Sequence, residues 1–86
     1  MRGNRQEVSE YCDENEIEIL LADGYDDALI GITEYGPGRE QLAVYDRDKC
    51  IEILMTRDGM SDEEAVEFFE FNTIGSWVGD KTPLFI

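Results

Sequence analysis

The chain has 86 residues, a formal net charge of −14 and a pI near 4.1. One domain of this length buries roughly 60% of its unfolded surface. With 42% hydrophobic residues, wholesale disorder is excluded. Self-repulsion of this size also excludes electrostatic attraction to nucleic acid or to an anionic membrane, and it leaves basic protein surfaces and cations as partners. Solubility alone is the plainest explanation of the acidity.

The N-terminal half predicts one short helix followed by strands. Residues 1–5 are polar and basic and are expected to fray, while residues 6–15 indicate a short amphipathic helix. Residues 16–22 begin as polar and apolar alternation, the pattern of a half-buried strand. Further strands are predicted over residues 28–35 and 40–45. The short separations between the three strands favour an antiparallel meander.

The clearest pattern is a pair of consecutive helices in the C-terminal half. The first begins at Asp46, whose carboxylate can accept hydrogen bonds from the first helical turn. Gly59 supplies the left-handed residue that ends a helix without Cβ strain. The second helix is predicted within residues 60–72 and opens with a capping box formed by Ser61 and Glu64. This pair is the part of the architecture that the sequence specifies most strongly.

After the helices, residues 73–81 are punctuated by glycine and residues 82–86 form an apolar tail. Pro83 favours an edge strand or a docked extension for that tail. The expected fold is a single α+β domain over residues 1–86, with a small antiparallel three- to four-stranded sheet packed against the helix pair. Because such a sheet exposes an edge, and because residues 16–22 and the tail are apolar, we also expect a homodimer.

Catalytic motifs are absent from the sequence. There is no histidine, no glycine-rich phosphate loop, no serine-centred elbow and no cysteine pair at metal spacing. Cys12 and Cys50 do not make a disulfide framework, and Cys50 lies on the apolar stripe of a helix. We therefore expect a non-enzyme without a cofactor. The sequence shows no signal peptide, lipidation motif or long apolar run, which favours the cytoplasm and no membrane contact.

Two small constellations admit a ligand. Asp23, Asp26 and Asp27 surround a glycine and could hold a hard cation through oxygens, but their spacing matches no EF-hand loop, and turn-forming aspartates are the preferred interpretation. Asn72 follows three phenylalanines and is interpreted first as a capping or turn residue. Its alternative role is a polar anchor in a ligand pocket beside Trp77.

The C-terminal half carries a pattern of short pieces that is specific only in combination. It comprises Tyr45, Asp46, Lys49, Cys50, Ile51, Leu54, Met55, Asp58, Gly59, Met60, Ser61, Glu64, Ala65, Glu67, Phe68, Phe71, Asn72, Gly75, Trp77, Val78, Gly79, Asp80, Thr82, Pro83 and Phe85. With this pattern the C-terminal half resembles small uncharacterised proteins of tailed bacteriophages and prophages. The resemblance implies an origin and no particular activity.

A phage origin makes a non-catalytic binding protein the leading hypothesis, with a host or phage protein as its partner. Small acidic phage proteins often block host enzymes, and a sharper version is mimicry of DNA against a defence nuclease. Two groups of carboxylates are candidates for that surface, one alternating along a predicted strand and one following a helical line. They are Glu14, Glu16 and Glu18, and Glu63, Glu67 and Glu70. The alternative function is a small-molecule or divalent-metal-binding domain with its pocket near Asn72 and Trp77.

Overall fold

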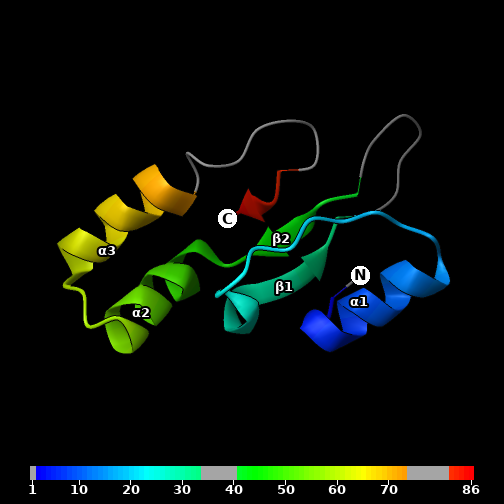
Figure 1. Cartoon of the computed structure of the whole chain (residues 1–86), viewed down its shortest axis with the longest axis horizontal. Helices are drawn as coiled ribbons and strands as arrows, with labels where there is room; N and C mark the ends of the chain where they lie inside the picture. The colour runs from blue at the N-terminus through cyan, green and yellow to red at the C-terminus, as the bar shows by residue number, and fades with distance from the viewer. Residues whose placement is uncertain (1, 34–40, 74–81) are drawn as a thin grey trace.

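A computed structural model of the chain describes residues 2–33, 41–73 and 82–86. Three α-helices and a small sheet confirm the α+β class, and the molecule is elongated, with α1 at one end and α3 at the other (Figure 1). In chain order the elements are α1 (Arg5–Glu14), the 3₁₀ turn η1 (Asp26–Ala28), β1 (Leu29–Ile32), β2 (Ala43–Tyr45), α2 (Arg47–Arg57), α3 (Asp62–Phe68), the π-helical turn η2 (Phe69–Thr73) and β3 (Leu84–Phe85).

The sheet is mixed, so the prediction of an antiparallel sheet is wrong in part. Among the described residues its order is β1-β2-β3, with β1 antiparallel to β2 and β2 parallel to β3. Val44 pairs with Leu84 and Tyr45 pairs with Phe85. The physical reason is the connection between these strands. A short turn can join only antiparallel neighbours, whereas the chain between β2 and β3 contains the helix pair and returns to the same end of the sheet.

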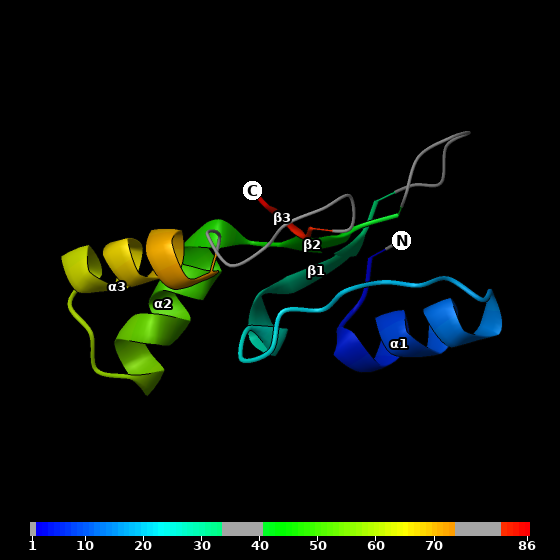
Figure 2. The same cartoon turned by 45° about the horizontal axis from the view of Figure 1, so that its top comes forward.

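Residues 16–22 are not a strand, although their polar and apolar alternation is real. Ile17, Ile19 and Leu21 are half-buried, whereas Glu18 and Leu20 are exposed. The segment crosses the sheet as irregular chain (Figure 2), and its apolar side chains pack against the core. Alternation therefore reported correctly which side of an extended segment is buried. It carried no information about a hydrogen-bonding partner, which is what defines a strand.

The segment departs from a strand at its first residue because α1 ends there in a Schellman motif. The Ile17 N–H donates to the Cys12 carbonyl at 2.8 Å and the Glu16 N–H donates to the Asp13 carbonyl at 3.4 Å. This geometry puts Glu16 at φ 54°, in the left-handed region that favours glycine. A side chain with a Cβ is strained in that conformation.

We expect Glu16→Gly to stabilise the fold by roughly 0.5–1 kcal/mol, because relief of the left-handed strain exceeds the added freedom of the unfolded chain. Urea unfolding monitored by circular dichroism measures the change. Glu16→Ala is the matched control, since it removes the charge and keeps the Cβ. An equal gain in the alanine variant would show that charge repulsion, and not backbone strain, limits stability at this position.

Residues 2–4, part of the segment expected to fray, have hydrogen-bonding partners in the structure. Arg2 forms a bridge with Gly31, and the Gly3 N–H donates to the Ile30 carbonyl at 2.9 Å. Asn4 caps α1, with Glu7 completing a capping box. The predicted helix over residues 6–15 is confirmed as α1, and these contacts fasten its start to β1.

The helix pair is confirmed with its predicted signals. The Asp46 side chain accepts from the Lys49 N–H at 3.1 Å, and Ser61 and Glu64 form both hydrogen bonds of the capping box. Gly59 has φ 67°, as predicted for the residue that ends α2. In both views α2 and α3 lie side by side at the end of the sheet where β2 finishes (Figures 1 and 2).

A cluster of aromatic rings joins the helix pair to the sheet. Tyr45 and Phe69 are fully buried. Phe85 stacks on Tyr45 at a centroid distance of 5.4 Å and meets Phe69 edge-on at 5.1 Å, and Tyr25 meets Phe69 at 5.9 Å. The tail is thus an edge strand docked on its own core, as one interpretation of Pro83 predicted. Of the two apolar segments from which a homodimer was expected, Leu21 and Phe85 pack on the core of the same chain, whereas Leu20, Leu84 and Ile86 are exposed.

Candidate functional site

The outward side of α3 and η2 gathers acidic and apolar side chains in one place. Ala65 and Phe69 are fully buried against α2 and the core. Because neighbouring helical positions differ by about 100° in direction, positions near these two buried residues can point away from the core. Phe68 and Phe71 do so, with 37% and 75% of their surface exposed. We call this surface the α3 face.

One half of the α3 face is acidic. Three of the predicted carboxylates, Glu63, Glu67 and Glu70, line a single shallow hollow of about 690 Å³ together with Asp62 and Val66. The Arg47 guanidinium donates to Glu70 at 3.0 Å and lies over the Phe69 ring. Within the described chain, Glu63 and Glu67 have no salt-bridge partner. These two carboxylates therefore present their charge to solvent.

The other half of the α3 face is a groove with both apolar and polar lining, which we call the Phe68–Phe71 groove. It has a volume of about 380 Å³ and shares Glu67 with the acidic hollow. Its lining residues are Met60, Glu64, Glu67, Phe68, Phe71 and Asn72. Asn72, interpreted from the sequence as a cap or a pocket anchor, is exposed at the rim of this groove within η2. Trp77, the other predicted pocket residue, lies outside the described residues.

The second predicted acidic group is not a row. Glu14 is the last residue of α1, Glu16 occupies the left-handed position after it, and Glu18 is exposed on the irregular segment. Their expected alternation along one strand face required a strand, and there is none. Figure 1 places this region at the opposite end of the molecule from α3, so the two predicted groups do not form one continuous surface.

The aspartates around Gly24 already have a cation beside them. The Arg5 guanidinium lies 2.8 Å from Asp26 and 3.5 Å from Asp23. The described residues contain no group of three or more carboxylate or thiol side chains arranged to hold a metal ion. Asp27 instead lines an open hollow of about 460 Å³ between this turn and α2. Asp23 and Asp26 of this turn thus form ion pairs with Arg5 of α1.

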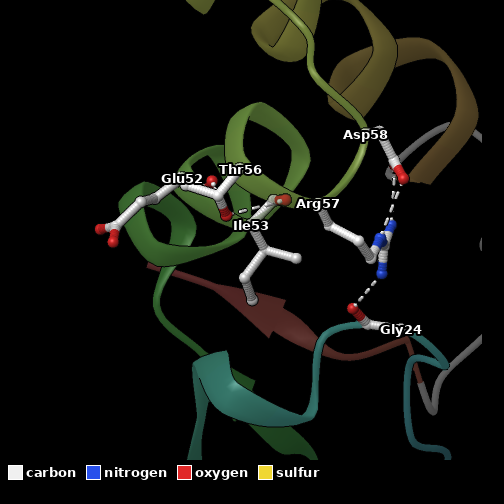
Figure 3. Close-up of polar contacts among 6 residues, drawn as sticks. All are labelled: Gly24, Glu52, Ile53, Thr56, Arg57 and Asp58. Carbon is white, nitrogen blue, oxygen red and sulfur yellow. Dashed lines mark hydrogen bonds and ion pairs between the residues drawn. The ribbon is translucent and has the colours of Figure 1, made fainter.

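Arg57 fastens the same turn to the end of α2 (Figure 3). Its Nε and Nη2 atoms donate to the Asp58 carboxylate at 3.1 and 3.0 Å, while Nη1 donates to the Gly24 carbonyl at 2.7 Å. The hydrogen bond from Arg57 lowers the pKa of Asp58. Gly24 has φ 89°, and a Cβ there would lie 2.9 Å from Arg57 Nη1. No sequence pattern predicts this contact, which joins residues 33 positions apart.

We expect Gly24→Ala to cost about 1 kcal/mol more stability than Gly59→Ala. Both substitutions strain a left-handed residue, but only at Gly24 must the Arg57 side chain withdraw and give up its hydrogen bond. Nothing lies within 4 Å of a Cβ at Gly59. Thermal unfolding measures both variants, and in an Arg57→Met background the extra cost should vanish. If the extra cost persists there, the Arg57 contact does not cause it.

The two cysteine thiols have low reactivity. Both are free and buried. Burial raises the pKa of Cys50 to about 12, with a further contribution from the Asp46 carboxylate, and burial likewise raises the pKa of Cys12. Since the thiolate is the reactive form, neither cysteine is activated as a nucleophile at neutral pH.

The chain matches no known protein-family model, no curated protein and no solved structure in the comparisons. No helix in the described part of the chain is long and apolar enough to cross a membrane. Function must therefore be argued from the α3 face itself.

Proposed function

We propose that this chain is a non-catalytic binding protein of phage or prophage origin, and that it acts on another protein through its negative surface. The observation that carries the proposal is the α3 face, where Glu63 and Glu67 have no salt-bridge partner among the described residues and Glu67 lines a groove with the exposed ring of Phe71. Interfaces combine apolar anchors with a charged rim, and complementary charge sets specificity and the rate of encounter.

The distribution of positive charge supports a partner that is basic. Arg5, Arg47, Lys49 and Arg57 each lie within 4 Å of a carboxylate of the same chain. These side chains neutralise acids locally, and the chain as a whole keeps an excess of 14 negative charges. A basic protein surface is attracted to that field, whereas an acidic one is repelled.

Mimicry of DNA against a defence nuclease is a narrower form of the proposal, and it has less support. Duplex DNA carries one charge per roughly 1.7 Å of axis. On a helix, residues four apart such as Glu63 and Glu67 are separated by roughly 6 Å along the axis. Glu70, the next carboxylate of the line, is paired with Arg47. A charge row this sparse fits a basic segment of protein better than a DNA-binding channel.

The alternative, a small-molecule or divalent-metal-binding domain, draws its support from the position of Asn72 on a groove with two aromatic rings. Thermal shift against nucleotides and divalent ions tests it, because a ligand of the native state raises the melting temperature by mass action. A shift that Asn72→Ala abolishes would favour this alternative, and a flat panel would remove it.

Capture from bacterial lysate tests the leading proposal. The tagged full chain should retain a stoichiometric protein partner at 0.15 M salt, with retention falling as salt rises. The double variant Glu63→Gln and Glu67→Gln should weaken capture. Glu10→Gln with Glu14→Gln is a control of equal net charge on α1, and it should not. Absence of a stoichiometric partner, or equal loss in both variants, would contradict the proposal.

A further inference from the structure

We propose that the Phe68–Phe71 groove is the docking site for a cationic amphipathic helix of the partner, with an apolar residue seated between the two rings. This inference rests on the proposed function and deepens it, since it names the chemistry of the partner segment. It begins from an unusual exposure: 75% of Phe71 and 37% of Phe68 face solvent, although the neighbouring Phe69 is fully buried.

The apolar part of the groove sets the first requirement for its occupant. Met60 is half-buried at one end, and the rings of Phe68 and Phe71 form the rest of the apolar lining. Met and aromatic side chains adapt to and anchor apolar partner groups. The occupant must therefore offer at least one large apolar side chain, such as leucine, to bury against them.

The carboxylates set the second requirement. Glu64 and Glu67 line the groove, and Glu67 also borders the adjacent hollow that contains Glu63. A residue bound in the groove thus has negative charge along its flank. Lysine or arginine three or four positions from the apolar anchor would meet these carboxylates, which is the spacing that a helix provides.

Charge complementarity decides among the occupants. A second copy of this chain carries the same excess of 14 negative charges and is repelled, as is any acidic peptide or nucleic acid. The groove is also shallow and open. Small molecules usually bind in enclosed pockets, so this shape suits a longer segment of a partner protein better. A basic amphipathic helix satisfies the apolar and acidic halves of the α3 face together.

The test is a titration of the full chain into a fluorescently labelled 14-residue model peptide of leucine and lysine, patterned as an amphipathic helix, monitored by anisotropy. Phe71→Ser should weaken binding about fivefold or more, because it removes the apolar anchor point. Glu67→Gln should weaken it about two- to fivefold at low salt, and less at high salt. Glu10→Gln, an exposed carboxylate of α1 outside both candidate groups, is the matched charge control and should leave binding unchanged.

A second peptide separates apolar docking from charge attraction alone. It has serine in place of every leucine, keeps the same number of lysines, and should bind about tenfold more weakly. Equal binding of the two peptides, no effect of Phe71→Ser, or no binding of the leucine peptide would overturn the inference. The lysate capture is independent of this result. If a captured partner depends on Glu63 and Glu67 but not on Phe71, the proposed function stands and the groove inference fails.

Discussion

Replacing Phe69 by alanine is expected to lower the free energy of unfolding by about 3–5 kcal/mol. The ring is fully buried, contacts Tyr25 and Phe85 edge-on, and lies under the Arg47 guanidinium. Its removal leaves a cavity where α3, α2 and β3 meet. Since a domain of this size has a total stability of roughly 4–13 kcal/mol, the variant should unfold at a much lower urea concentration.

Phe71→Ala is the matched control, two positions along the same segment. Because 75% of the surface of Phe71 is exposed, this substitution should change the free energy of unfolding by less than about 0.5 kcal/mol. Urea unfolding by circular dichroism compares the two variants directly. Equal destabilisation would mean that both rings are buried in solution, and it would also remove the exposed groove on which the docking proposal depends.

The second large effect is a loss of stability in alkali. Burial raises the pKa of Cys50 from 9.0 to about 12, so the folded state keeps the thiol protonated while the unfolded state releases its proton near pH 9. The stabilisation is therefore complete below pH 9 and is lost between pH 9 and about 12, at about 1.4 kcal/mol per pH unit. Burial also raises the pKa of Tyr45 above 10.0, which adds to the loss above pH 10.

Urea unfolding at pH 8, 9 and 10, in the presence of a reductant, measures this dependence. Cys50→Ala costs stability at pH 8 through lost packing, but its stability should decline less steeply between pH 9 and 10, before the tyrosine contributes. If the wild type and Cys50→Ala lose stability in parallel over that interval, ionisation of Cys50 is not the cause.

Local signals in the sequence predicted the local structure, and contacts between distant residues decided the rest. Asp46, Gly59 and the Ser61–Glu64 capping box each act within one helical turn, so their effect on the backbone can be read from spacing alone. The parallel pairing of Val44 with Leu84 joins residues on opposite sides of the helix pair. Rules based on short connections between strands do not predict a pairing between residues so far apart in the sequence.

The candidate site shows the same division. Glu63, Glu67 and Glu70 were predicted on a helical line, and they share one hollow because the helix forms where expected. The strand that was predicted to align the carboxylates at residues 14–18 does not form, because a strand needs a neighbouring strand as its hydrogen-bonding partner. The two exposed rings of the groove were missed, although a signal existed. Phe68 and Phe69 are adjacent on a helix and point about 100° apart, which favours exposure of one of the two rings.

The position of β3 has a consequence for the order in which the protein can fold during synthesis. The ring of Phe85 completes the aromatic cluster of Tyr45 and Phe69, and the Ile86 N–H donates to the Tyr45 carbonyl at 3.0 Å. A nascent chain that ends before residue 84 therefore has its helix pair and β2 but leaves both rings partly uncovered. Stable folding must wait until residues 84–86 have left the ribosome, and until then the incomplete chain exposes apolar surface to its surroundings.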